Sequence, residues 1–167
     1  MATLVENKKI RLDYEIMESY EAGIELLGFE VKSLRAHTAS LLGSYVIIRG
    51  GEAFLVGAHI PPFQEKNTPT SYDPNRNRRL LLRKNEIAEL ANLKKGLTVV
   101  PISVYSKGGE KRVVNGKNVK SKNSSEITTG GKIKIDIAIV RGKKKYDKRE
   151  TLKKRASERD IAREFAL

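Results

Sequence analysis

The chain has 167 residues, enough for one domain with a modest core, and it contains 33 lysines and arginines against 20 aspartates and glutamates. Residues 1–140 carry +7 of the net charge of +13 and residues 141–167 carry +6, so we expect a polyanionic partner such as nucleic acid. The chain contains no cysteine, which excludes disulfides, cysteine nucleophiles and cysteine-based zinc sites.

The first third of the chain predicts two strands around an ambiguous segment. Residues 10–16 (IRLDYEI) alternate apolar and charged side chains, which is typical of a strand with one buried face. Residues 21–28 (EAGIELLG) are compatible with one or two helical turns closed by glycine. Residues 29–35 (FEVKSLR) resume the alternation and predict a second half-buried strand.

A β-hairpin is predicted in residues 44–60 (SYVIIRGGEAFLVGAHI). Its centre is the pair Gly50-Gly51, because a tight hairpin turn needs positive φ angles that glycine adopts without strain. Pro61 and Pro62 should end the second strand, and the polar residues 63–77 read as a loop.

The second half predicts a helix and two more strands. Leucine, isoleucine and alanine recur near helical spacing over residues 78–93, with Asn77 as the N-cap and Gly96 closing the helix. Residues 97–105 (LTVVPISVY) predict a strand whose proline favours an edge or a bulge. Residues 132–140 (KIKIDIAIV) alternate isoleucine with polar side chains and predict another strand.

This series favours a mainly β fold, an OB-fold-like small β-barrel with accessory α-helices and a basic C-terminal tail. We assign residues 1–142 to the barrel and residues 143–167 to the tail, which we expect to be disordered when free. Residues 110–131 are dominated by lysine, asparagine, serine, threonine and glycine, and predict an extended hairpin or a disordered loop inside the barrel sequence.

Catalytic and metal-binding patterns are missing from the sequence. The histidines His37 and His59 stand in no metal-ligand spacing, and the glycine-rich stretches lack the spacing of a phosphate loop. The start of the chain has no apolar signal region, and no apolar run approaches the roughly 18 residues needed to span a bilayer. We therefore expect a cytoplasmic protein that is not an enzyme, with no cofactor and no membrane partner.

Five separated blocks resemble one family. They are NKKIRLDYEI, EAGIELLGFEVKSLRA, SYVIIRGGEAFLVGAHIPP, DPNRNRRLLLRKNEI and RGKKKYDKRETLKKR. In this order they resemble small protein B, the SsrA-binding proteins that partner transfer-messenger RNA (tmRNA) in bacterial ribosome rescue. The resemblance implies an OB-type barrel that holds the tRNA-like domain of tmRNA. It also implies delivery of the charged RNA, with elongation factor Tu and GTP, to a stalled ribosome.

The resemblance also implies an RNA-binding set in the barrel. Its asparagine falls at Asn7, beside cations suited to phosphates, and its glutamate at Glu21 would accept from a base amino group or orient a neighbouring arginine. The leucine at Leu81 would pack on a sugar or base, although a single leucine is more often a core residue. The predicted set is Asn7, Lys8, Arg11, Glu21, Lys32, Arg35, Arg76 and Leu81.

For the tail the resemblance implies binding to rRNA of the decoding site and the empty mRNA channel, where it would form a helix. Arg155, Arg159 and Arg163 recur at i,i+4 and repel one another in a free helix, so contact with rRNA should favour ordering. The predicted contacts are Lys143, Lys144, Lys145, Asp147, Lys148, Arg149, Lys153, Lys154 and Arg155.

Two alternatives remain open from the sequence. The first is a generic OB-fold protein that binds single-stranded nucleic acid or sits permanently in the ribosome, although such binders usually carry more aromatic stacking residues. The second is an RNA-processing enzyme, which the lack of an acid/base or metal constellation disfavours. The family pattern has glycine where this chain has His37 and aspartate where it has Gly43, which predicts a rearranged loop there.

Overall fold

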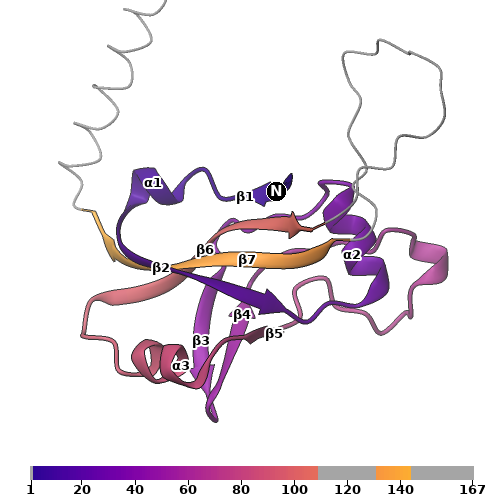
Figure 1. Cartoon of the computed structure of the whole chain (residues 1–167). Coiled ribbons are helices and arrows are strands. Elements are labelled where there is room, and N and C mark those ends of the chain that lie inside the picture. Colours follow the sequence, from indigo (N-terminus) through magenta and orange to yellow (C-terminus); the bar gives the residue numbers. More distant parts are fainter. Residues whose placement is uncertain (1, 109–130, 144–167) are drawn as a thin grey trace, which may run out of the picture.

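The computed structural model describes residues 2–108 and 131–143, and these residues form a mainly antiparallel β architecture with short helices (Figure 1). The fold class predicted from the sequence is therefore confirmed. The strands are β1 (Ala2–Glu6), β2 (Tyr14–Ile24), β3 (Tyr45–Arg49), β4 (Glu52–Val56), β5 (Arg78–Leu81), β6 (Leu97–Lys107) and β7 (Lys132–Gly142). The helices are α1 (Ile10–Asp13), α2 (Gly28–Arg35), α3 (Lys84–Ala91) and the 3-10 turn η1 (Glu65–Asn67).

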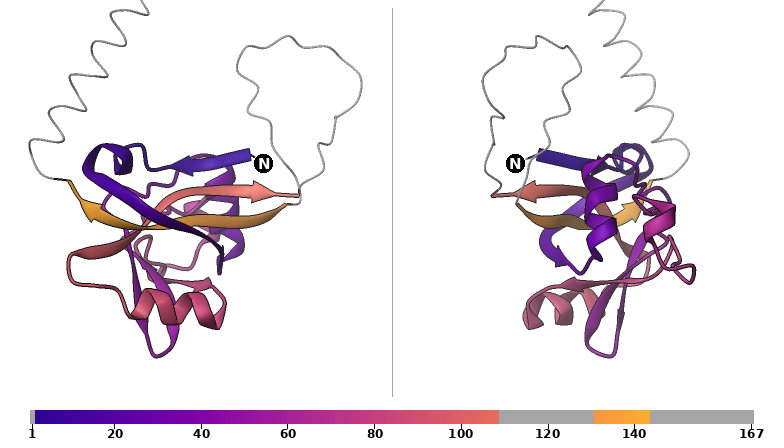
Figure 2. Two further views of the ribbon diagram at one scale, coloured as in Figure 1. Left: turned by 60° about the vertical axis from the view of Figure 1, so that its left-hand side comes forward. Right: turned by 90° about the vertical axis from the view of Figure 1, so that its right-hand side faces the viewer.

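Strand pairing runs in a closed circuit. The order is β6–β3–β4–β5–β2–β7, and β7 pairs back onto β6, while β1 pairs with β6 from outside the circuit. The circuit encloses one hydrophobic core, whereas β1 has a neighbour on one side only. In both views of Figure 2, α1 and β1 lie on one side of the ribbon formed by β2, β7 and β6, whereas the β3–β4 hairpin and α3 lie on the other.

The core lies inside the circuit and follows the period of the strands. Ile135, Ile137 and Ile139 of β7 point inward and are at most 7% exposed, which confirms the strand predicted over residues 132–140. Strand β6 confirms the prediction for residues 97–105, and its register shifts between Pro101 and Ser103, as the predicted bulge requires.

The predicted hairpin is confirmed as β3 and β4, joined at Gly50 and Gly51 with φ angles of +60° and +76°. The loop after it carries only η1 as regular structure among residues 63–77.

The prediction of a strand over residues 10–16 is wrong for its first half. Residues 10–13 form the single helical turn α1, and strand β2 begins only at Tyr14. Ile10 is 2% exposed and packs with Val100, Ala138 and Val140 on the outer side of the ribbon. A segment of four residues is too short for its apolar pattern to distinguish a helix from a strand. The packing of Ile10 therefore decides the conformation.

The predictions for residues 21–35 are reversed in the structure. Residues 21–24 continue β2, because Ala22 points into the core while β7 and β5 pair with the two edges of the strand. Residues 28–35 form α2 rather than a strand. Its buried positions are Glu30, Ser33 and Leu34, a helical spacing that the polar identity of the first two residues hides from a hydrophobicity pattern.

The helix predicted over residues 78–93 is two elements. Residues 78–81 form β5, with Arg78 and Leu80 buried and the residues after each of them exposed, and α3 begins only at Lys84. The predicted N-cap at Asn77 is therefore wrong. The alternation is hidden in the sequence because the buried side chain at position 78 is an arginine.

The loop after α2 carries the two departures from the family pattern. His37 adopts φ +58°, a left-handed conformation that favours glycine, and Gly43 adopts φ +75°. The Nδ1 of His37 hydrogen-bonds to the carbonyl oxygen of Leu4 at 2.6 Å, an arrangement in which Nδ1–H donates. This bond attaches the loop to β1 and offsets the backbone strain.

Candidate nucleic-acid interface

The outer side of the β2–β7–β6 ribbon is half covered and half open. Near Tyr14 it is covered by α1 and the small apolar cluster around Ile10. Towards the other ends of the strands most outward positions are polar, and the residues next to them in sequence point into the core. The open half, called here the Glu21 face, consists of Glu21, Gly23, Leu81, Ser103, Tyr105, Lys107, Lys134 and Asp136.

Strand register brings these residues together from distant parts of the chain. Glu21 of β2 pairs with Asp136 of β7, which pairs with Ser103 of β6. One step further along the sheet, Leu81 pairs with Gly23, which pairs with Lys134, and Lys134 pairs with Tyr105. Two residues that the family resemblance indicates, at positions 21 and 81, are thus neighbours on one sheet surface.

Glu21 is the centre of a hydrogen-bond cluster. Tyr105 Oη donates to its carboxylate at 2.5 Å, Lys107 Nζ donates at 2.9 and 3.1 Å, and Lys134 Nζ lies 3.6 Å away. The hydrogen bond from Tyr105, followed by that from Lys107, lowers the pKa of Glu21 from 4.5 to about 2. Burial and the hydrogen bond to Glu21 raise the pKa of Tyr105 well above its ordinary value of 10. The carboxylate is therefore ionised at neutral pH and orients two lysines.

The Glu21 face carries equal numbers of acidic and basic side chains. Asp136 accepts a hydrogen bond from the Ser103 hydroxyl at 3.1 Å, so two carboxylates stand beside two lysines. Additional positive charge comes from the rim: Lys132 is exposed at the start of β7, and Arg35 Nη2 reaches the carbonyl oxygen of Gly131 at 3.4 Å. Fixed donors and acceptors of this kind suit RNA, whose 2′-hydroxyls both donate and accept.

One of the two predicted residues of α2 lies near the start of β7. Lys32 is exposed, and Arg35 lies at the last turn of the helix, where its Nη2 donates to the carbonyl oxygen of Gly131, directly before β7. The Nε of Arg35 is buried and has no hydrogen-bond partner among the described residues. Arg35 is therefore close to the start of β7.

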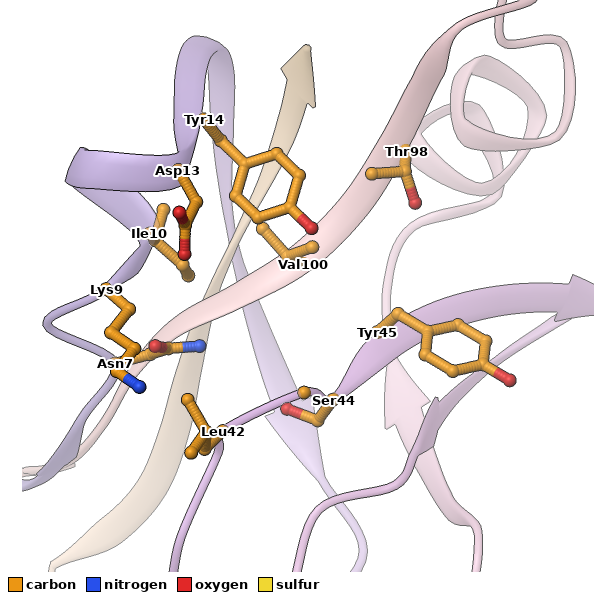
Figure 3. Close-up of a pocket in the computed structure, with 11 residues that line it drawn as sticks. Asn7, Lys9, Ile10, Asp13, Tyr14, Leu42, Ser44, Tyr45, Thr98 and Val100 are labelled. Carbon is orange, nitrogen blue, oxygen red and sulfur yellow. The ribbon is translucent and has the colours of Figure 1, made fainter. Parts of the chain in front are cut away.

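The predicted N-terminal residues lie at the covered half instead. Asn7 lines a pocket of about 530 Å³ together with Tyr14, Tyr45 and Leu42, and its Nδ2 donates to the carbonyl oxygen of Leu41 at 3.1 Å (Figure 3). Lys8 and Arg11 are exposed at the entry to α1 and on it.

Lys143, the one predicted tail contact within the described residues, lies next to this pocket. Its backbone N–H donates to the carbonyl oxygen of Asp13 and its Nζ to that of Arg11, both at 3.0 Å. The chain therefore leaves the sheet beside α1. The other predicted tail contacts, from Lys144 to Arg155, lie outside the described residues.

Arg76 forms an ion pair with Glu30 of α2, away from the Glu21 face. Its Nη2 and Nε donate to Glu30 at 2.6 and 2.9 Å, and Arg78, fully buried, donates to the same carboxylate at 3.0 Å. This network holds the loop before β5 against α2. The structure thus places Arg76 in an ion pair and does not bring it to the Glu21 face, and its contact with RNA stays a prediction.

Sequence reasoning missed Tyr105, Lys107 and Lys134. The alternation of the strands does indicate that these three side chains point outward. Two of them lie within predicted strands, and Lys107 lies two residues beyond the end of one. Which outward residues of different strands become neighbours depends on register, which one-dimensional patterns do not contain.

Within residues 2–108 and 131–143 there is no cluster of three or more histidine, cysteine, aspartate or glutamate side chains that could hold a metal. The same residues contain no helix long and apolar enough to cross a membrane.

Comparison with known proteins identifies relatives over nearly the whole chain. SsrA-binding proteins are 44% identical in Nitratidesulfovibrio vulgaris strain DP4, over 98% of this chain and 92% of that protein, and 41% identical in Microcystis aeruginosa, over 96% and 91%. A chain in the solved structure "tmRNA-SmpB: a journey to the center of the bacterial ribosome" is 37% identical, with a TM-score of 0.58 over 88% of this chain and 92% of that one. The profile of the SmpB protein family matches residues 4–127 and 124–167. The chain therefore belongs to the SmpB family of SsrA-binding proteins.

Proposed function

We propose that this protein binds transfer-messenger RNA and delivers it to stalled ribosomes in trans-translation. The observation that carries the proposal is the Glu21 face, in a chain whose relatives are named for binding SsrA RNA. Glu21 holds Lys107 and Lys134 in fixed positions, and the half-exposed Leu81 lies beside them on the same surface. Phosphates would meet the lysines, and a sugar or base would meet the leucine.

The arrangement favours a structured RNA over an arbitrary single strand. Binders of single strands use several exposed aromatic rings as stacking platforms. On the Glu21 face the aromatic side chain is Tyr105, which is 6% exposed and whose hydroxyl donates to Glu21. Ion-paired lysines at set positions instead match the phosphates of a rigid fold.

The remaining assignments belong to the same proposal. Residues 1–142 act as the RNA-binding unit, and the basic residues 143–167 contact rRNA of the decoding site and order in the empty mRNA channel. Asn7, Lys8 and Arg11 contact tmRNA in this proposal, and the carbonyl oxygen of Arg11 accepts a hydrogen bond from Lys143 Nζ where the tail begins. Elongation factor Tu arrives with the charged tmRNA, the protein itself performs no catalysis, and the process takes place in the cytoplasm.

The test is a filter-binding comparison of tmRNA, an ordinary tRNA and a single-stranded RNA at two salt concentrations. We expect tmRNA to bind most tightly. Replacing Lys107 or Lys134 by alanine should weaken binding and reduce the slope of log K against log salt by about one for each lost phosphate contact.

Lys95→Ala is the matched control, since Lys95 is an exposed lysine in the turn after α3, away from the Glu21 face. Equal affinity for all three RNAs would favour the generic OB-fold binder over this proposal. Hydrolysis of any of them in the presence of magnesium would favour an enzyme.

A further inference from the structure

Leu81 occupies space that a side chain at Gly23 would need. A Cβ atom added to Gly23 would lie 3.1 Å from Leu81 Cβ, 3.2 Å from its Cδ1 and 3.5 Å from its Cγ. Apolar carbons normally approach no closer than about 3.5–4.0 Å. The leucine side chain therefore lies flat against the bare backbone of β2, between β5 and Lys134, the residue with which Gly23 pairs on its other side.

The backbone of β2 does not itself require glycine at this position. Gly23 is not among the described residues with positive φ, and it lies in the regular ladder between β5 and β7. Glycine inside a strand normally weakens it and marks a site where another group approaches closely. The group that approaches here is Leu81, which is 51% exposed and thus gains little from its own burial.

We infer that Gly23 is a positioning residue for RNA binding. Because it has no side chain, Leu81 can pack against the backbone of β2, beside Lys134 and Glu21. This inference rests on the proposed function and deepens it. With the leucine lying flat, apolar surface and lysine ammonium groups form one continuous surface, on which a single nucleotide can place its sugar or base on Leu81 and its phosphate at the lysines. A side chain at position 23 would lift Leu81 and separate these two contacts.

The test is Gly23→Ala in the full-length protein, assayed for tmRNA affinity and for the midpoint of thermal unfolding. We expect a loss of affinity of about five- to tenfold, typical of a displaced contact inside an interface. The thermal midpoint should change little, because the strain of the 3.1 Å contact with Leu81 Cβ opposes the gain from restricting the unfolded chain. Gly28→Ala is the control: no atom lies within 4 Å of a Cβ at that position, so the affinity should not change.

A double variant shows whether the effect passes through Leu81. Leu81→Ala removes Cγ and Cδ1 but keeps the Cβ contact. Because the atoms proposed to contact RNA are already gone in Leu81→Ala, the variant carrying both Gly23→Ala and Leu81→Ala should bind within about twofold of Leu81→Ala alone, as expected for two residues that share one contact. Additive losses, or a fall in the thermal midpoint that parallels the loss of affinity, would overturn the inference in favour of a general distortion of the sheet. Unchanged affinity in Gly23→Ala would overturn it as well.

The inference and the proposed function fail in distinguishable ways. If the unaltered protein did not prefer tmRNA over tRNA, the proposed function would be rejected. The position of Leu81 is measured without RNA, as a nuclear Overhauser contact between the Leu81 methyl groups and the Gly23 Hα protons. We expect this contact in the unaltered protein and its loss in Gly23→Ala. Its absence from the unaltered protein would reject the inference alone.

Discussion

Glu30 shows how a buried carboxylate is accommodated in this protein. It is fully buried and accepts hydrogen bonds from Arg76, Arg78, the Tyr72 hydroxyl and the backbone N–H of Leu27. Burial raises the pKa of Glu30, but the hydrogen bond from Arg76 and the other contacts outweigh it, and the net pKa is lowered. The carboxylate is thus charged when folded and joins α2 to β5 and the loop before it.

Replacing Glu30 by alanine should destabilise the fold strongly. The change leaves the fully buried Arg78 without its counter-charge, and breaking a buried ion pair in this way costs about 3–5 kcal/mol. Urea denaturation followed by circular dichroism measures the loss. Glu25→Ala is the control, because Glu25 and Arg79 form an exposed pair at 3.4 Å whose loss should cost no more than about 1 kcal/mol. Similar costs for both variants would contradict this account of the network.

Glu21 predicts a pH dependence with a definite sign. Its pKa in the folded protein is about 2, below the ordinary value of 4.5 that applies to the unfolded chain. Its contribution to stability is therefore complete above about pH 4.5 and is lost as the pH falls towards 2. A carboxyl NMR titration should give a midpoint near 2 for Glu21, and the midpoint should move upwards in Tyr105→Phe, which removes the hydrogen bond that lowers this pKa most. An unperturbed midpoint would contradict the cluster described here.

At the scale of elements, the β3–β4 hairpin depends on its two turn glycines. A Cβ at Gly50 would meet no atom within 4 Å, so the cost of a side chain there comes from the positive φ of +60° alone. Gly50→Ala should therefore lower the free energy of unfolding by about 1–2 kcal/mol. Gly28→Ala, at a helical position without positive φ, should raise it by about 0.5–1 kcal/mol. Differential scanning calorimetry measures both changes, and equal signs would contradict the assignment of the turn.

At the scale of the whole molecule, positive charge and RNA specificity are separable. Residues 150–167 contain five basic and four acidic side chains, so deleting them lowers the net charge only from +13 to +12. Long-range attraction of RNA should therefore survive the deletion almost unchanged.

Deleting residues 150–167 should leave tmRNA affinity nearly intact and abolish tagging on stalled ribosomes. The physical reason is that the Glu21 face lies entirely within the residues that remain. Filter binding measures the first effect, and a reconstituted tagging reaction measures the second. A protein with residues 150–167 in scrambled order, which has the same length and charge, is the control and should bind RNA but fail in tagging. A collapse of RNA affinity, with tagging reduced only in proportion, would contradict this division between barrel and tail.

Local sequence patterns were enough to predict the strands whose buried positions are apolar and the turn between two of them. Residues 132–140 alternate isoleucine with polar side chains, and Gly50-Gly51 can adopt positive φ without strain, so local chemistry is sufficient there. The basic composition indicates nucleic acid, and the family resemblance singles out Glu21 and Leu81 from residue identity and order alone.

By contrast, α2, β5 and the composition of the Glu21 face depend on contacts between residues far apart in the sequence. The buried positions of α2 and β5 include Glu30 and Arg78, and burial of either charge is possible only because the two meet across 48 positions of sequence. A hydrophobicity pattern treats both as surface residues and assigns the wrong period. Likewise, Lys107, Lys134 and Glu21 become neighbours only through the register of three strands, and register is set by the packing of the opposite, inward side chains.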